Sequence, residues 1–326
     1  MSAHRLGFAV KVLGSGGLPS HDTRRWQSGP HLRHSLERLG TILDYLEAND
    51  IRMYRVATAL TPYASHPDLP RFHGQVGECA EELAAIGTLV RERGIRLSSH
   101  PGQYTVLNSE DARVRDAAAA ELEVQASLFD AMGLDEEAVV VLHVGGAAGG
   151  KAAAGERFLA GLDLLSERAR ARLVIENDDR SFGTTDVVEL AGRAGLRVVW
   201  DALHHQCNNP DGLGDANALA AALGTWAEDV RPKIHYSSPR LDLEERKVKR
   251  GRRVERRLVL PQLRTHADLV EPFGFEQFIR AAGRDFDVML EAKAKDLALL
   301  RLREQLAGRG LPTQDGRLMV SASPAG

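Results

Sequence analysis

Eight short apolar runs alternate with longer amphipathic segments along nearly the whole 326-residue chain, and this alternation limits the fold more than any other feature. Several runs are almost continuous Val, Ile and Leu, which is typical of strands buried on both faces. Eight strands that each precede a helix predict a single-domain α/β chain folded as a closed (β/α)₈ TIM barrel. An open doubly wound sheet is the alternative. The eight runs cover 5–10, 53–58, 96–100, 139–145, 172–178, 197–204, 233–237 and 287–293.

The segments between the runs carry helical periodicity. In 31–49, for example, leucines recur three and four residues apart, as on the buried face of an amphipathic helix. We expect the barrel domain to span 1–307, with a long loop at 238–269 after the seventh strand. The stretch 308–326 is rich in Gly, Pro, Ser and Ala, and we expect it to form a flexible tail.

Composition excludes several other classes of protein. The chain is 43% hydrophobic and 27% charged, which is ordinary for a globular protein and not for a disordered or fibrous one. No run approaches the ~18 apolar residues of a membrane span, and the N-terminus resembles no signal peptide. The two cysteines, Cys79 and Cys207, cannot form a disulfide framework, so we expect a cytoplasmic, reduced protein with no membrane contact.

Charge is distributed unevenly. The formal net charge is −3, but 240–257 holds nine Lys/Arg and four Asp/Glu, which leaves −8 on the rest of the chain. This basic segment falls in the seventh-strand loop, which in a barrel lies on the active-site face. It is compatible with a polyanionic partner. A charge run alone is more typical of a solvated, mobile loop, and both interpretations stay open at this point.

Metal-binding residue types recur at the carboxyl ends of the expected strands. One histidine in such a place is more often a hydrogen-bonded structural residue than a ligand. Six consecutive strand ends with such residues are much less expected by chance, and in a barrel these ends converge at one mouth. The candidate ligands are His100, His143, Glu176, Asp201, His204, His235 and Glu291, with His266 in the seventh-strand loop.

Imidazole and carboxylate ligands suit Zn²⁺ and Mn²⁺. At about three protein ligands per catalytic ion, eight candidates predict two or three divalent ions. Neighbouring ions ~3.5–4 Å apart activate water and stabilise an in-line displacement at phosphorus. Asp201 and His204 are three residues apart, a spacing that faces opposite sides of a regular strand, so the chain must turn after Asp201.

These residues lie in short motifs that together, in order and spacing, resemble the UV damage endonucleases of the UvdE type, from about 5 to 306. The resemblance implies a barrel related to endonuclease IV. The motifs are Ala64-Ser65-His66-Pro67, Ser99-His100-Pro101-Gly102-Gln103-Tyr104, Leu142-His143-Val144-Gly145-Gly146, Ile175-Glu176-Asn177-Asp178-Asp179, Asp201-Ala202-Leu203-His204-His205, Pro232-Lys233-Ile234-His235, Ser238-Pro239, His266-Ala267-Asp268 and Leu290-Glu291-Ala292-Lys293.

The resemblance also implies roles for the residues. The eight candidate ligands fall on the family's metal positions, for up to three ions assigned as Mn²⁺, with Zn²⁺ an option at some sites. Glu176 is expected to bridge ions, and His66 to be a hydrogen-bonding residue of the active site. Lys233 matches a lysine that can be carboxylated at its amine. A lysine that points to a phosphate is the equally open alternative.

Contacts to DNA are expected from two further places. Gln103 and Tyr104, on a loop opened by Pro101-Gly102, match the family's damage probe, although Tyr104 could instead pack on the barrel rim. Arg250, Arg252 and Arg253 of the basic segment are expected to contact phosphates. The chain departs from the family at Phe8, where a tyrosine is usual, and at Val12, where an asparagine is usual. Phe8 is expected to stack on displaced nucleotides.

The resulting prediction is a monomeric DNA repair endonuclease that acts on damaged double-stranded DNA and needs no protein partner. It would cut immediately 5′ of cyclobutane dimers and 6-4 photoproducts, with abasic sites as a further class of substrate. Water activated by the metal ions would attack phosphorus, leaving a 3′-OH and a 5′-phosphate. A metal-dependent sugar isomerase or epimerase is the first alternative, since these enzymes use related barrels. A lesion-binding protein without activity is the second.

Overall fold

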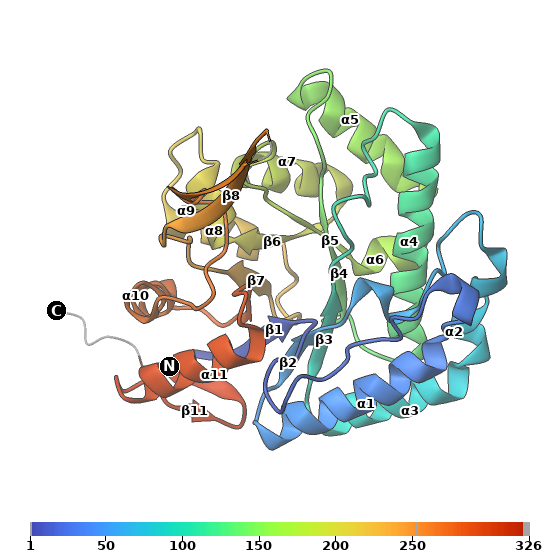
Figure 1. The fold of residues 1–326 in the computed structure, drawn as a ribbon, viewed down its shortest axis with the longest axis horizontal. Helices are drawn as coiled ribbons and strands as arrows, with labels where there is room; N and C mark the ends of the chain where they lie inside the picture. Colours follow the sequence, from blue (N-terminus) through green and yellow to red (C-terminus); the bar gives the residue numbers. More distant parts are fainter. Residues whose placement is uncertain (1, 252, 322–326) are drawn as a thin grey trace.

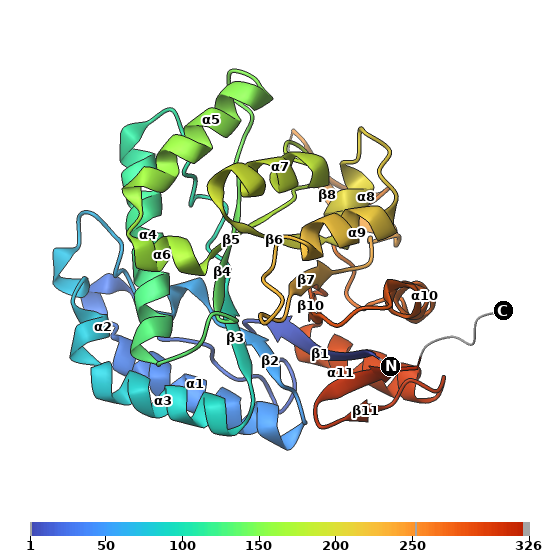
Figure 2. The same cartoon turned by 180° about the vertical axis from the view of Figure 1, so that it is seen from behind.

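Residues 2–251 and 253–321 are described by the computed structural model, and they form a closed barrel of eight parallel strands surrounded by helices (Figures 1 and 2). The sheet closes because β1 pairs in parallel with both β2 and β10, so that Phe8 lies opposite Tyr54 and Leu290. The predicted TIM barrel is confirmed, and the open sheet is excluded. The barrel strands are β1 (Ser2–Ala9), β2 (Met53–Arg55), β3 (Arg96–Ser99), β4 (Val139–His143), β5 (Leu173–Glu176), β6 (Arg197–Asp201), β7 (Lys233–Tyr236) and β10 (Asp287–Leu290).

Helices cover the outside of the barrel, as the amphipathic segments predict. On α1 the buried side chains include Leu36, Leu39 and Leu43, the expected apolar face. Short 3₁₀ turns lie at Trp26–Ser28, Thr58–Leu60, Pro70–Phe72 and Leu162–Leu164. The helices are α1 (Leu32–Ala48), α2 (Gln75–Glu78), α3 (Ala80–Glu92), α4 (Ala112–Ala131), α5 (Lys151–Gly161), α6 (Glu167–Arg172), α7 (Thr184–Ala194), α8 (Ala202–Cys207), α9 (Asp215–Leu223), α10 (Pro272–Ala282) and α11 (Lys295–Ala307). Within the described residues, none is long and apolar enough to cross a membrane.

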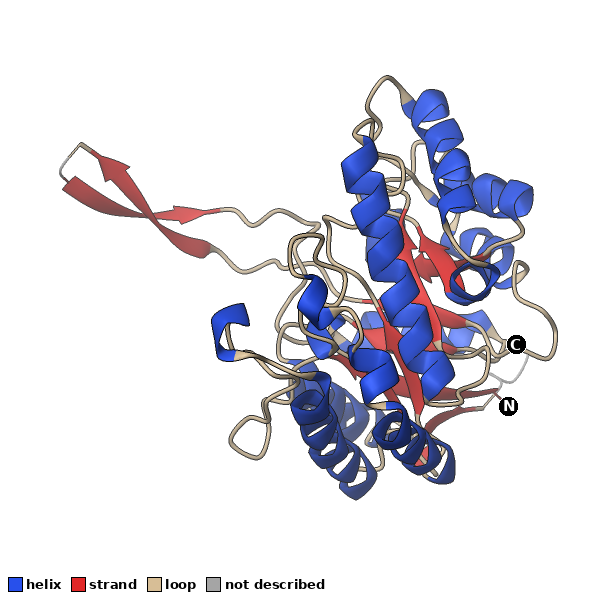
Figure 3. Cartoon of the chain, turned by 90° about the vertical axis from the view of Figure 1, so that its right-hand side faces the viewer, coloured by secondary structure: helices blue, strands red, loops and turns tan. Residues whose placement is uncertain are grey.

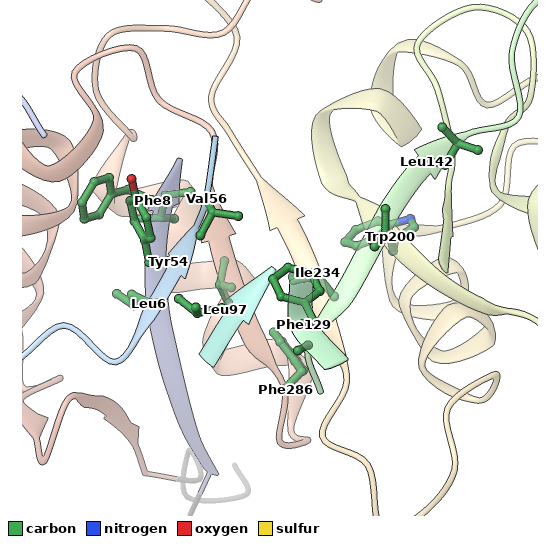
Figure 4. Packing of buried hydrophobic residues seen from close by; sticks show 14 of the residues in the cluster. Leu6, Phe8, Tyr54, Val56, Leu97, Phe129, Leu142, Trp200, Ile234 and Phe286 are labelled. Atoms are coloured by element: carbon green, nitrogen blue, oxygen red, sulfur yellow. The ribbon is translucent and has the colours of Figure 1, made fainter. Parts of the chain in front are cut away.

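The main hydrophobic core lies between the outward faces of the strands and the helices. Phe8, Tyr54 and Trp200 belong to it, and the rings of Phe8 and Tyr54 meet edge to face with centroids 5.4 Å apart (Figure 4). Because side chains alternate along a strand, the intervening residues point into the barrel. Inside, Val141, Val174 and other apolar side chains fill the middle, so the barrel is packed and the polar groups collect at its two ends.

At the amino ends of the strands a buried ion-pair network closes the barrel. Asp287 is fully buried and accepts hydrogen bonds from Arg5 Nε at 2.8 Å, Arg96 Nη1 at 2.9 Å and Arg231 Nε at 2.9 Å. Arg5 also pairs with Glu137. We call these five residues the floor. Burial raises the pKa of Asp287, but the three guanidinium groups outweigh burial and leave the pKa below its usual value.

The carboxyl-terminal stretch differs from the flexible tail expected from its composition. Thr313–Gln314 (β11) and Arg317–Val320 (β12) form a hairpin, and β12 pairs antiparallel with β1, with Leu318 opposite His4. Leu311 and Leu318 are fully buried, which explains why the segment is ordered despite its Gly and Pro content. Of the expected tail, residues 322–326 lie outside the described part.

The loop after β7 contains a two-stranded antiparallel hairpin that the sequence did not predict. Its strands are β8 (Glu244–Arg250) and β9 (Arg253–Val259), which pair with each other and, within 2–251 and 253–321, with no strand of the barrel. Figure 3 shows this hairpin extending well away from the helices and the barrel. Most of the described basic segment therefore lies in a two-stranded ribbon on the active-site side of the fold.

Candidate metal centre

The predicted ligands meet at the carboxyl ends of the strands. Three sets each place their ligand atoms within 4.8 Å of one another, as required for binding a metal ion. We call this collection, together with His266, the mouth. The sets are His100, His143 and Glu176; Glu176, Asp201 and His204; and Asp201, His235 and Glu291.

Glu176 lies at the centre of the mouth. Its Oε2 is 2.9 Å from His100 Nε2 and 3.8 Å from His143 Nε2. Its Oε1 is 2.9 Å from His235 Nδ1 and 3.6 Å from His204 Nδ1. Each oxygen therefore faces a different pair of histidines. This is the arrangement expected of a carboxylate that bridges two ions.

The barrel register explains how these residues come together. His143 lies opposite Glu176 on β4 and β5, and Asp201 lies opposite His235 on β6 and β7. After Asp201 the chain turns into α8, and Asp201 Oδ1 caps this helix by accepting from the His204 backbone N–H at 2.7 Å. The turn brings both side chains of the Asp201–His204 pair to one site, as their spacing requires.

Glu291 and His266 form the remaining side of the mouth. Glu291 Oε1 is 3.4 Å from His235 Nδ1, and Glu291 Oε2 is 3.7 Å from His266 Nδ1. His266 also hydrogen-bonds the Glu291 carbonyl at 2.9 Å through the same Nδ1, so this ring is held beside the loop that supplies Glu291.

Sequence reasoning missed Arg55 and Asn177. Arg55 is the last residue of β2, and its guanidinium pairs with Glu291. No sequence signal identified Arg55, because the second apolar run was expected to extend to 58 and an arginine is not a metal-ligand type. Asn177 is buried and exchanges two hydrogen bonds with the Asp201 backbone, at 2.8 and 3.0 Å, which fixes the end of β6 against β5.

Burial and nearby charges shift the pKa values of two histidines of the mouth in opposite directions. Burial lowers the pKa of His100 to about 4, although Glu176 favours its charged form. Burial also acts against charge on His204, but Asp201, Glu176 and Glu291 together outweigh it and raise the pKa of His204 to about 9. Burial likewise opposes ionisation of Glu176, yet His235 and His143 hold its pKa well below the usual range. The lowered pKa of Glu176 favours its charged form, which suits the binding of cations.

The donor set fits divalent ions. Asp201 Oδ2, His235 Nε2 and His143 Nδ1 are buried and have no hydrogen-bond partner among the described residues. Buried polar atoms are rarely left without partners, because each costs about 1–3 kcal/mol. A cation held by Asp201 and His235 would satisfy two of these atoms.

The other two predicted catalytic residues lie in different settings. Lys233 is fully buried on β7, and its Nζ donates to Ser98 Oγ at 2.9 Å. Burial, with Arg55 and Arg96 nearby, lowers its pKa well below the usual range. His66 is exposed in the loop after β2, where its Nδ1 accepts from the Asp68 backbone, and it belongs to none of the three ligand sets.

The residues predicted to touch DNA divide into accessible and buried ones. Gln103 is exposed and Tyr104 is 85% exposed, so Tyr104 does not pack on the barrel rim. Arg250 and Arg253 are exposed on the hairpin, whereas the Arg252 prediction lies outside the described residues. The prediction for Phe8 is wrong. Its ring is fully buried in the core against Tyr54, because Phe8 points outward from β1 toward the helices, and it cannot stack on a nucleotide there.

Fold and mouth together define a TIM barrel whose active-site end carries a histidine- and carboxylate-rich cluster able to hold divalent ions. A family model described as "UV-endonuclease UvdE" matches residues 32–314. The chain belongs to this family, and it is an endonuclease of DNA repair.

Individual relatives agree with this assignment. The chain is 29% identical over 293 residues to a UV DNA damage endonuclease of Bacillus cereus (strain G9842), covering 88% of this chain and 86% of the relative. It is 33% identical over 261 residues to that of Bacillus pumilus (strain SAFR-032), covering 80% and 76%. The crystal structure of SacUVDE superposes with a TM-score of 0.78 at 28% identity, covering 94% and 99%. A D-tagatose 3-epimerase-like protein, with a TM-score of 0.53 and 14% identity, shares the fold.

Proposed function

We propose that this endonuclease uses two or three divalent ions, most readily Mn²⁺, to cut the phosphodiester bond immediately 5′ of UV photoproducts. Zn²⁺ at some of the sites is compatible with the same ligands. The observation that carries the proposal is the mouth itself, in which seven other ligand-type side chains lie around Glu176 in a chain of the UvdE family. Cyclobutane dimers and 6-4 photoproducts are the proposed substrates, with abasic sites as a further class.

The residues of the mouth would hold the ions and the scissile phosphate. Bound divalent ions lower the pKa of water and neutralise charge on a phosphate. Glu176 would keep two ions adjacent, since its two oxygens face different histidines. Arg55 would hold the Glu291 carboxylate in place. The products of in-line displacement at phosphorus would be a 3′-OH and a 5′-phosphate.

Lys233 has an environment suited to carboxylation. Its lowered pKa favours the neutral amine, which is the form that adds to CO₂ to give a carbamate with release of a proton. A carbamate at this buried position would carry negative charge toward the cations, whereas an ammonium would be repelled by them. We propose the carbamate as the active form of Lys233, with His66 as a hydrogen-bonding residue at the edge of the site.

Lesion recognition would depend on the loop that follows β3. Gln103 and Tyr104 are both exposed, and His100, at the start of the same loop, touches Glu176. An aromatic ring and an amide so placed can fill the space left when damaged bases leave the stack. Opening is cheaper at a lesion than in intact duplex, so this filling would convert distortion into selectivity.

The first experiment is a nicking assay on plasmid DNA with and without UV irradiation, with Mn²⁺ or with a chelator. We expect the enzyme to nick only the irradiated plasmid, and only when Mn²⁺ is present. The nicks should have 3′-OH and 5′-phosphate ends and map immediately 5′ of the photoproduct. Nicking of both plasmids at the same rate would contradict damage dependence. Nicking that survives full chelation would contradict the metal role.

The proposed enzyme works as a monomer on damaged duplex DNA, in the cytoplasm and on the nucleoid when bound. Size-exclusion chromatography with light scattering, under the conditions of the nicking assay, tests whether the enzyme is a monomer. We expect a mass near the chain's 35.6 kDa. A stable dimer required for nicking would contradict it.

A further inference from the structure

The β8–β9 hairpin places several positively charged side chains directly opposite one another, which does not help its two strands to pair. Register places Arg246 opposite Arg257 and Arg250 opposite Arg253, and Lys247 lies opposite Arg256. Like charges directly opposite each other on a sheet are destabilising. Because side chains alternate, the first two pairs share one face and the third lies on the other, so both faces of the ribbon are cationic.

The carboxylates of the hairpin form ion pairs with only some of its positively charged side chains. Glu244 pairs with Arg240 and Arg246, Glu245 with Arg256, and Glu255 with Arg257. Four other cations have no carboxylate within ion-pair distance in the described part of the chain. They include the last pair before the turn and are Lys247, Lys249, Arg250 and Arg253. The unneutralised charge is therefore concentrated toward the end of the hairpin remote from the barrel.

The base of the hairpin is joined to the mouth. Pro239 forms a bridge with His266, and the Ala267 backbone N–H donates to the Ser238 carbonyl at 2.9 Å. Arg240 donates from its backbone to the Thr265 carbonyl at 2.7 Å. From this base the ribbon extends away from the body of the molecule (Figure 3). A duplex with a phosphate in the mouth would therefore have the ribbon beside it.

The dimensions of the ribbon fit one groove of DNA. A two-stranded β-ribbon is accommodated by the major groove, ≈12 Å wide, whereas the minor groove of B-form DNA is ≈6 Å wide. Seven-residue strands extend about 23 Å at ~3.3 Å per residue, which equals about seven base pairs at ~3.4 Å. Cations on both faces would then meet phosphates on both walls of the groove.

We propose that the β8–β9 hairpin is a second DNA-binding element, which lies in the major groove of intact duplex beside the lesion and contacts phosphates through Lys247, Lys249, Arg250 and Arg253. The inference rests on the proposed function in that duplex DNA is the substrate. It adds a contact remote from the metal ions and independent of damage. Affinity for undamaged duplex, and the length of DNA needed beside a lesion, would depend on this hairpin.

The test measures binding of undamaged 40-base-pair duplex as a function of salt, so it does not depend on incision. Arg250→Gln/Arg253→Gln is compared with Arg193→Gln/Arg301→Gln, which removes equal charge from the exposed faces of α7 and α11. We expect the hairpin variant to lower the log–log salt slope by about two and the control variant to leave it unchanged. An unchanged slope in the hairpin variant, or the same loss of affinity for single-stranded DNA, would overturn the proposal.

A second duplex identifies the groove. Bulky substituents at pyrimidine C5 project into the major groove. Wild-type affinity for duplex so modified should fall, and the hairpin variant, which keeps only two of the four proposed contacts, should lose less affinity than the wild type. Unchanged wild-type affinity would overturn the assignment to the major groove. If the wild-type protein shows these binding differences but does not cut irradiated DNA, the proposed function is contradicted. The assignment of the hairpin as a DNA-binding element is then unaffected.

Discussion

The floor and the mouth both bury charge inside the same barrel, but they neutralise it in different ways. On the floor, the Asp287 carboxylate receives hydrogen bonds from three arginines at 2.8–2.9 Å. In the mouth, Glu176 and Glu291 lie among histidines, while Asp201 Oδ2 and His235 Nε2 have no partner in the described structure. The Asp287 carboxylate thus has its counter-charges within the protein, although Arg96 Nη2 lacks a hydrogen-bond partner among the described residues, whereas the open ligand atoms of the mouth could be satisfied by cations.

This difference suggests that the floor contributes to stability and the mouth to the chemical reaction. Buried ion pairs that satisfy each other hold strands together, and in TIM barrels the amino-terminal end serves stability while the carboxyl-terminal end carries the active site. A change on the floor should therefore alter folding and spare the chemistry. A change in the mouth should do the reverse. The predictions below test this separation, in order of decreasing expected effect.

The largest effect is expected for Glu176→Gln in the mouth. An amide is a poor bridging ligand, so the variant should lose at least one ion and lower nicking of irradiated plasmid by about 10³-fold, equivalent to about 4 kcal/mol. Thermal unfolding of the metal-free protein should occur near the wild-type temperature. Full activity with full metal occupancy would remove Glu176 from the centre of the site.

On the floor, Asp287→Asn should destabilise the protein by about 3 kcal/mol, because three guanidinium groups, two of them buried, lose their shared counter-charge. Urea unfolding measures this free energy. Metal content and turnover of the folded fraction should match the wild type. Normal stability combined with loss of metal would reverse the roles assigned to the two ends of the barrel.

A smaller effect is expected at the damage probe. Stacking of Tyr104 on a base is worth about 1–3 kcal/mol, so Gln103→Ala/Tyr104→Ala should lower incision of a lesion-bearing duplex by roughly 10- to 100-fold. Metal content should be normal. The loss should shrink when the bases opposite the lesion are mismatched, since the duplex is then partly opened. Equal losses on both duplexes would show that the pair supports the site and does not probe DNA.

The smallest effect concerns pH. A histidine must lose its proton to bind a metal ion, and in the metal-free protein the pKa of His204 is raised to about 9. Between pH 7 and 8, Mn²⁺ affinity should therefore rise by up to about tenfold, and it should level off above pH 9. Titration calorimetry in buffers of different ionisation enthalpy should detect about one proton released through this residue. The His204→Gln variant, which cannot bind through imidazole, is the control, and a pH-independent affinity in the wild type would contradict the assignment.

Much of the mouth could be predicted from the sequence because barrel strands are nearly continuous apolar runs. Once His143, Glu176 and Asp201 stand at the ends of such runs, the topology brings them together without further information. Arg55 was missed because its contribution is a charge for Glu291, which is visible only when β2 and β10 are placed around the barrel.

The errors have a common physical origin. Phe8 could point into the barrel or outward to the helices, depending on its place in the alternation of side chains along β1. The resemblance to the family at this position does not determine that direction. The hairpin and β12 are built from polar or Gly-containing segments whose strand character comes from pairing with another segment. Composition alone makes such segments resemble loops and tails.

The central claim is that the mouth is a multi-ion centre, and the direct test is the number of divalent ions per chain. Wild-type protein loaded with Mn²⁺ and freed of excess ions should contain two or three per chain by elemental analysis. Asp287→Asn should contain the same number, and Glu176→Gln at least one fewer. One ion or none in an active wild-type enzyme, or equal content in all three proteins, would contradict the claim.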